Sequence, residues 1–187
     1  MKRRSKWILT AGILLLAISL CLLVLPQVMH YYGARHAADT VARIEAALPN
    51  RIAGAPDSYR VMQMPTLEVD GEDYIGLLEI SAHSVILPIG NDWQAAQLYR
   101  HPCRFDGTAY DGSLIIGGGS RQMACLKQMQ NGDKVTVTDM HGAIFTYTVT
   151  RIRRADRADG DTLRSTAALT LFARDANNMD YVIVECE

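Results

Sequence analysis

Cysteine and histidine side chains are the residues of this chain best suited to chemistry, because a thiol beside an imidazole can act as a nucleophile. Cys103, Cys125 and Cys186 lie beyond an N-terminal apolar run, and His101 is two residues before Cys103. Residues two apart on a strand share one face, so Cys103 with His101 is one candidate pair, and Cys125 is a second candidate nucleophile. The simpler interpretation is that Cys125 packs within a helix and that His101 belongs to a loop.

Cys103 and Cys186 can also have purely structural roles. We expect Cys103 and Cys186 to be small buried residues on strands, with a disulfide between them as the alternative. A small secreted domain that depended on disulfides would contain more cysteines than this chain has.

Other patterns for ligand binding are weak. The glycines of residues 117–119, followed by Ser120, come after a strand but lack the lysine and the glycine spacing of a phosphate-binding loop. We interpret them as a strand end at which two backbones approach closely. The net charge of -1 leaves no basic footprint for nucleic acid. The sequence therefore indicates no cofactor, no metal site and no nucleic-acid partner.

The elements that must position these residues are mostly short strands, since brief apolar runs alternate with turn signals beyond Asp70. We expect a tight turn over 139–142, with a positive φ at Gly142, and a β-bulge near Thr150. Short helices are expected over Asp92–Tyr99 and Met123–Met129. The eight expected strands are Tyr74–Ile80, Val85–Ile89, Cys103–Phe105, Leu114–Gly117, Lys134–Met140, Ala143–Arg153, Ala168–Ala173 and Tyr181–Glu185.

The N-terminal region predicts a membrane anchor. Four basic residues within 2–6 precede an apolar run from Trp7 to Leu25, which is long enough to cross the hydrocarbon core as a helix. The basic flank places the N-terminus in the cytoplasm and the rest outside the cell. A cleaved signal peptide is the competing interpretation, but the run is longer than its usual core and no Ala-x-Ala site follows.

We therefore expect three regions: 1–26, a basic tail and transmembrane anchor; 27–70, a membrane-proximal amphipathic helix over Ala34–Leu48 and a linker arm over Arg51–Asp70; and 71–187, an all-β domain.

Several segments of that domain resemble the sortases, the extracellular cysteine transpeptidases of Gram-positive bacteria. The matching stretches are Asp73–Ile80, Leu87–Ile89, Pro102–Gly107, Gly112–Gly118 and Thr170–Ala173. The resemblance implies a closed eight-stranded barrel with short helices, and as partner a peptide, a surface protein or an active sortase. Together with the expected anchor, it implies a single-pass plasma-membrane protein.

The three catalytic positions of the family are all substituted in this alignment. Gly119 stands at the histidine, Arg174 at the cysteine and Tyr181 at the arginine. The resemblance thus implies a sortase-like protein that binds a sorting-signal peptide or surface protein without cutting it. The alternatives are an active transpeptidase with a rearranged site, using Cys125 or Cys103 with His101, and a structural spacer or assembly module.

The expected peptide groove follows from the same resemblance. We expect Arg174 to lie at its floor, paired with Asp175, Asp180 or a carboxylate of a loop, because a buried charge needs a partner. The connection before the penultimate strand, rich in arginine, would form one wall. The expected groove residues are Leu114, Ile116, Gly118, Gly119, Ser120, Leu169, Leu171, Ala173, Arg174, Tyr181, Arg154 and Arg157.

Overall fold

The computed structural model describes residues 2–49, 52–53, 63–94 and 97–187, with the side chains of 13–25, 35–49, 63–94 and 97–187. The chain divides into two units, Met1–His36 and Ala37–Glu187. Helix α1 (Lys2–Ala47) provides all of the described N-terminal unit and the first residues of the second.

The first unit does not support the expected transmembrane anchor over Trp7–Leu25. Among the residues described, no helix combines the length and the apolar character that a membrane crossing requires.

The second unit begins with the last turns of α1, which form the expected amphipathic helix. Ile44 is fully buried and packs with Tyr74, Leu77 and Met140 of the β domain. Arg43, the residue before Ile44, is exposed, and its Nη1 lies 2.8 Å from Oδ1 of Asp70. The helix ends at Ala47, ahead of the proline that cannot continue it.

All eight strands expected from the sequence form, and each extends one or two residues beyond or short of its predicted bounds. They are β3 (Glu72–Ile80), β4 (Val85–Gly90), β5 (Cys103–Asp106), β6 (Leu114–Gly118), β7 (Lys134–Asp139), β8 (Ala143–Ala155), β9 (Leu169–Arg174) and β10 (Tyr181–Cys186). Two further strands, β1 (Ile52–Ala53) and β2 (Leu67–Val69), lie within the segment expected to be a linker arm.

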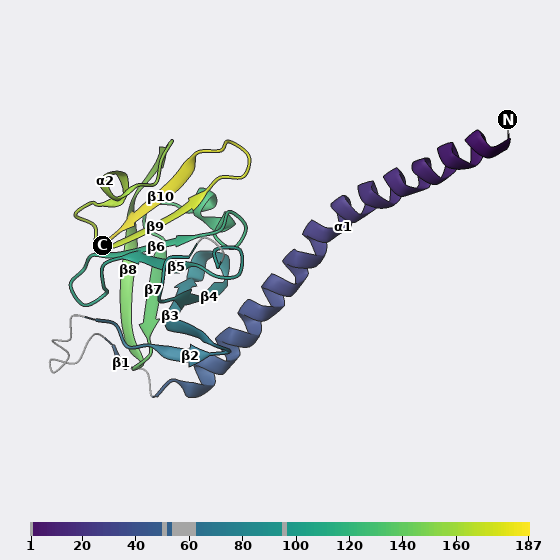
Figure 1. The fold of residues 1–187 in the computed structure, drawn as a ribbon. Helices are drawn as coiled ribbons and strands as arrows, with labels where there is room; N and C mark the ends of the chain where they lie inside the picture. The colour runs from purple at the N-terminus through teal and green to yellow at the C-terminus, as the bar shows by residue number, and fades with distance from the viewer. Residues whose placement is uncertain (1, 50–51, 54–62, 95–96) are drawn as a thin grey trace. The chain divides into compact units, whose positions relative to one another are not determined.

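The eight longer strands close into a barrel, as Figure 1 shows. The order β3-β4-β5-β6-β9-β10-β8 is closed by β7, which pairs with both β3 and β8. Strands β6 and β9 are parallel and side by side, with Leu114 opposite Leu169. The pairing of β4 with β5 holds only one residue pair, Gly90 with Cys103, and these two strands diverge beyond it.

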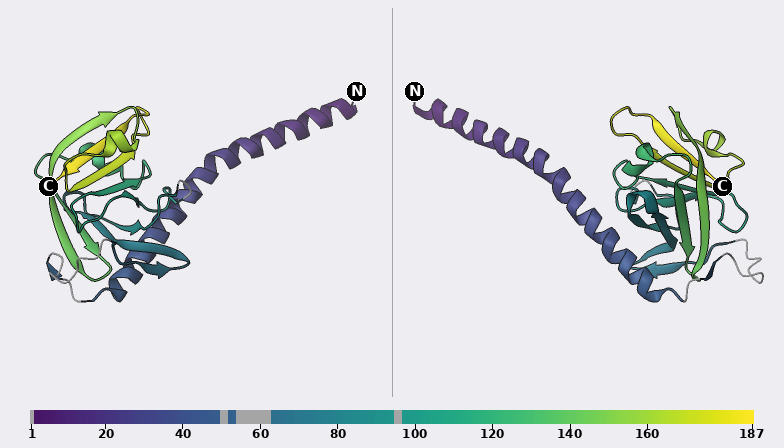
Figure 2. Two further views of the ribbon diagram at one scale, coloured as in Figure 1. Left: turned by 60° about the vertical axis from the view of Figure 1, so that its left-hand side comes forward. Right: turned by 180° about the vertical axis from the view of Figure 1, so that it is seen from behind.

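Alternation along the strands separates two layers of apolar side chains. One set fills the inside of the barrel and includes Leu78, Ile116, Leu171 and Val184. The other lies on the outer face of β6, β9 and β10 and includes Phe172. Figure 2 shows the strands of the barrel from two further sides.

The bulge and the tight turn are confirmed. Glu185 pairs with Arg151 and Cys186 with Val149, so Thr150 is the extra residue of β8. Gly142 has a φ of 80° and its amide donates to the Asp139 carbonyl over 3.0 Å.

The short helices are only partly as expected. The structure has a 3-10 helix η2 (Ala124–Gln128) within the range predicted for the second helix, together with η1 (Ser81–His83) and α2 (Gly160–Leu163). The expected helix over Asp92–Tyr99 is wrong for its described residues, which form bends and turns; residues 95 and 96 lie outside the description. The side chain of Trp93 packs on Phe105 and Phe172, which holds this segment against the barrel.

Candidate functional site

The three positions at which the sortase resemblance expects catalytic residues come together at one end of the barrel. Gly118 pairs with Ala173 across the parallel strands β6 and β9, so Gly119 lies beside the end of β9. Arg174 ends β9 and pairs directly with Tyr181 at the start of β10. The juxtaposition predicted from the sequence is therefore present, with glycine, arginine and tyrosine side by side.

Arg174 borders a small hollow of about 30 Å³ at these strand ends, enough for about one water molecule. Its side chain is exposed, and its Nε donates to the Met179 carbonyl over 3.3 Å. No thiol or imidazole is present among the described residues that line the hollow. They are Ser120, Met123, Ala124, Lys127, Ala173, Arg174, Asp175, Ala176 and Val182.

The expected partners of Arg174 belong to another arginine. Arg154 of β8 places Nη1 3.1 Å from Asp175 and 3.0 Å from Asp180. Bonds from the Asn177 amide and from Arg154 lower the pKa of the Asp175 carboxyl. The predicted pairing of Arg174 with Asp175 or Asp180 is wrong, because a strand-end arginine that reaches water needs no carboxylate. Arg154 thus ties three strand ends together.

Gly119 allows a close approach of two backbones. A Cβ atom at this position would lie 2.3 Å from the Leu98 carbonyl oxygen and 2.5 Å from Oε1 of Gln122. The Gln122 side chain can rotate away, but the carbonyl belongs to the turn of residues 97–100. The main chain therefore occupies the volume into which a histidine at position 119 would have to project.

The apolar side chains that were expected to line the groove point into the barrel. Leu114, Ile116, Leu169 and Leu171 are fully buried inside the barrel, so they do not line an accessible surface. Ala173 and Gly118 are also buried. Arg157 is exposed on the connection between β8 and β9.

The outer face of the same strands is covered. Leu163 of α2 is fully buried against Ile115, Phe172 and Ile183. Arg153 links α2 to the sheet, because it donates to the Thr162 carbonyl of α2 and to the Glu185 side chain of β10, the latter over 2.8 Å. The connection that the resemblance assigns to a groove wall therefore covers the outer face of β6, β9 and β10.

The alternative cysteine–histidine pair is also brought together, in a buried network. Sγ of Cys103 lies 3.6 Å from Nδ1 of His101, and Nε2 of that imidazole lies 3.1 Å from a Glu72 carboxylate oxygen. Arg100 and Tyr74 also donate to Glu72, over 2.7 and 2.9 Å. Burial opposes ionisation of Glu72, but the bonds from His101 and Tyr74 hold the pKa of its carboxyl below the ordinary value.

This arrangement resembles a nucleophile, a base and an orienting acid, but it faces no solvent. Cys103 has no exposed surface and His101 is 1% exposed. Burial raises the pKa of the Cys103 thiol to about 11, so it is a poor source of thiolate at neutral pH. Cys125 is half-buried in η2, and burial raises the pKa of its thiol as well. All four cysteines are free, so the alternative disulfide does not form.

Glu72 was not a candidate in the sequence because nothing in its spacing links it to His101. The signal that was available is its position on the first long strand, whose neighbour β4 leads to the segment ending at His101. The pairing of Gly90 with Cys103 brings these segments together in the structure, and sequence spacing does not reveal it.

Comparison with known proteins gives relatives in structure but not in sequence. No protein-family model and no curated protein sequence matches the chain. Among solved structures, sortase C1 from Streptococcus agalactiae is similar with a TM-score of 0.56 and 18% identity, over 70% of this chain and 78% of that one. Sortase C-3 from Streptococcus pneumoniae has a TM-score of 0.54 and 19% identity, over 85% and 82%.

Sortase A from Corynebacterium diphtheriae is similar with a TM-score of 0.54 and 19% identity, and the match covers 62% of this chain and 60% of that sortase. These likenesses agree with the closed barrel described above. The β domain of this chain therefore has the sortase fold.

Proposed function

We propose that this protein is a sortase-like binding protein that does not carry out transpeptidation, and that it binds a sorting-signal peptide or a surface-protein partner. The observation that carries the proposal is the set of residues at the three adjacent strand ends, Gly119, Arg174 and Tyr181. A binding role needs only the surface that remains around them.

The loss of chemistry follows from what these side chains can do. Transpeptidation needs a thiolate nucleophile, an acid for the leaving amine and a donor for the oxyanion. Arginine is permanently protonated, glycine has no side chain, and a tyrosine hydroxyl is at best a weak donor. Removing a nucleophile or base from such a site typically lowers turnover by a factor on the order of 10⁶. The Leu98 carbonyl beside Gly119 adds a steric obstacle.

Two exposed cations, one from η2 and one from the end of β9, support binding. Lys127 and Arg174 line the small hollow and are both exposed. Carboxylates and backbone carbonyls of an extended peptide are suitable acceptors for both side chains. The covered outer face means that a peptide reaches Phe172 only if the β8–β9 connection moves. Without such a movement, the peptide would bind at the small hollow lined by Lys127 and Arg174.

We further propose that the β domain lies at the cell surface. The support is the likeness of its fold to the sortases, which are typically cell-surface proteins. Protease treatment of intact cells tests it, since an external domain is degraded while cytoplasmic proteins survive. Protection of the domain until the cells are lysed would contradict this placement.

Turnover and binding can be measured separately on the full-length chain. We expect no cleavage or transfer of a panel of quenched fluorescent sorting-signal peptides in the presence of an amine acceptor, with an active sortase as positive control. We expect titration with unlabelled peptide to shift NMR resonances of Lys127 and Arg174. Arg174→Gln and Lys127→Gln should weaken that binding, and Lys134→Gln on β7 should not.

Each other outcome has a definite meaning. If no peptide shifts any resonance, and no surface protein binds, the spacer alternative replaces the proposal. If peptides are turned over, the geometry of Cys103 and His101 favours the second candidate function, a cysteine transpeptidase with a relocated site. That activity would be abolished by a thiol alkylator and by Cys103→Ala or His101→Ala.

A further inference from the structure

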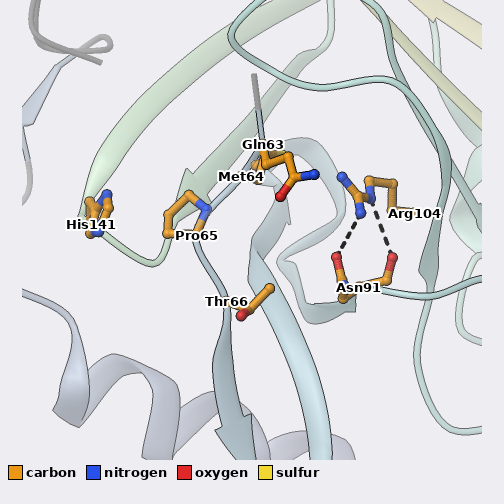
Figure 3. A pocket seen from close by; sticks show the side chains of 7 residues that line it. All are labelled: Gln63, Met64, Pro65, Thr66, Asn91, Arg104 and His141. Carbon is orange, nitrogen blue, oxygen red and sulfur yellow. Dashed lines mark hydrogen bonds between the residues drawn. The ribbon is translucent and has the colours of Figure 1, made fainter. Parts of the chain in front are cut away.

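A second hollow lies away from the strand ends, where β4 and β5 separate. It has a volume of about 510 Å³, within the range of small-molecule sites. Figure 3 shows its lining, with Arg104 and Asn91 on one side and His141 at the far end. The lining residues are Gln63, Met64, Pro65, Thr66, Asn91, Arg104 and His141.

Arg104 is held in a fixed orientation at the wall of this pocket. Its Nε donates to the Asn91 main-chain carbonyl over 3.3 Å, and its Nη2 donates to Oδ1 of the same residue over 2.7 Å. Asn91 thus occupies one edge of the planar guanidinium. The opposite edge, formed by Nη1 and the second Nη2 hydrogen, keeps the fork geometry that matches a carboxylate.

The surroundings of Arg104 differ from those of comparable arginines. Arg100, Arg104 and Arg153 are the partly exposed arginines of the described chain. Arg100 contacts Glu72 and Arg153 contacts Glu185, in each case at hydrogen-bond distance. Within the described residues, Arg104 has no carboxylate within 4.0 Å, and its side-chain bonds go only to Asn91. A partly buried cation without an anion is unfavourable unless one is supplied.

The rest of the lining favours an organic anion. No acidic side chain is among the seven lining residues, so none of the lining residues repels a carboxylate. The Thr66 hydroxyl and the Gln63 amide are neutral hydrogen-bonding groups, and Figure 3 shows the Gln63 side chain pointing toward Arg104. Met64, which is 4% exposed, and Pro65 add apolar surface. A single oriented fork, neutral donors and apolar contacts suit a carboxylate on a small organic body.

We propose that this pocket binds the carboxylate of a ligand of amino-acid or short-peptide size, with Arg104 as the anion anchor and Asn91 as its positioning residue. The site is separate from the strand ends of Gly119 and Arg174. It does not depend on the binding function proposed for them.

The test is binding of N-acetyl-dialanine to the full-length chain, measured by isothermal titration calorimetry at constant ionic strength for every variant. In the wild type, the NMR signal of the Arg104 Nε–H group reports whether the ligand binds at this pocket. The C-terminal amide of N-acetyl-dialanine is the matched ligand without charge, and inorganic phosphate and sulfate are the comparison anions. We expect the free acid to bind and the amide to fail. Loss of charge-assisted bonds of about 1.5–3 kcal/mol corresponds to roughly tenfold to hundredfold weaker binding for Arg104→Gln.

Two further variants separate charge from geometry. Arg104→Lys keeps the charge but loses the fork, so it should bind more weakly than the wild type and better than Arg104→Gln. Arg121→Gln removes an exposed arginine that does not line the pocket, and it should bind like the wild type. Three results overturn the proposal: equal binding of acid and amide, undiminished binding by Arg104→Gln, or binding of phosphate and sulfate only. None of them bears on sorting-signal binding, which is read at Arg174.

Discussion

Adding one methyl group at Gly119 tests whether the Leu98 main chain fills the place of the family histidine. The new Cβ atom would lie 2.3 Å from the Leu98 carbonyl oxygen, far inside van der Waals contact. Because the obstructing atom belongs to the backbone, the turn of residues 97–100 has to move. Overpacking of this kind typically costs about 1–3 kcal/mol, so Gly119→Ala should lower the free energy of unfolding by that amount.

The control is Gly160→Ala. A Cβ atom there meets nothing within 4 Å, and Gly160 is the first residue of α2. Alanine is the better helix former by roughly 1 kcal/mol, so this variant should be neutral or slightly more stable.

Urea unfolding of the full-length chain, with midpoint and slope fitted for each variant, gives the comparison. Each kcal/mol should also appear as roughly 2–4 °C in the melting temperature for a domain of this size. If Gly119→Ala unfolds within about 0.5 kcal/mol of the wild type while Gly160→Ala behaves as expected, the Leu98 carbonyl does not close the site. The same steric argument predicts that the triple variant Gly119→His, Arg174→Cys and Tyr181→Arg stays inactive even when folded, although the catalytic residue types have been restored.

Three further results are expected. The Cys103 thiol, buried and with a pKa of about 11, should resist iodoacetamide at pH 8 until the chain unfolds, and rapid labelling of the folded chain would contradict the burial. The stability that the protonated thiol contributes is complete below pH 9.0 and is lost as the pH rises through about 11. The difference in unfolding free energy between wild type and Cys103→Ala should therefore change with pH in that window. Arg153→Ala should cost about 1.5–3 kcal/mol and expose the β8–β9 connection to limited proteolysis, because Glu185 and the Thr162 carbonyl lose their donor, whereas Arg157→Ala should match the wild type in both assays. Asp139→Ala should destabilise the chain by at least about 2 kcal/mol in urea unfolding, since the buried carboxylate accepts from the main-chain amides of His141 and Ala143 and from the Tyr110 hydroxyl. If Asp139→Asn costs as much as the alanine variant, these bonds do not have the proposed role.

The strands could be predicted because alternation and turn residues are local signals. The extra residue at Thr150 was visible as a slip in the apolar pattern of one long strand. Strand β2 was not visible, because three residues are too few to show a period, and it forms only by pairing with β3. The segment after Asp92 has a helical pattern, but packing of Trp93 on two phenylalanines outweighs that weak preference.

The positions of the candidate site followed from the order of the strands, but the direction of their side chains did not. The stretch from Leu169 to Ala173 is almost entirely apolar, so it does not show which alternate residues face the barrel interior. In the structure Leu171 faces inward and Phe172 outward. Similarly, the nearness of Asp175 to Arg174 in sequence does not reveal that Arg154, two strands away, takes the carboxylate.

The place of β10 in the sheet constrains how the protein is made. This strand is the last of the barrel in chain order, yet it lies between β8 and β9 and pairs with both along its whole length. Until residues 181–186 leave the ribosome, β8 and β9 both present unpaired edges, which are sites for aggregation with other chains. Pairs as distant as Leu114 with Leu169 also slow the search for the native topology. The barrel therefore has to fold after synthesis of its last strand, and a nascent chain stalled before Tyr181 should depend on a chaperone to stay soluble.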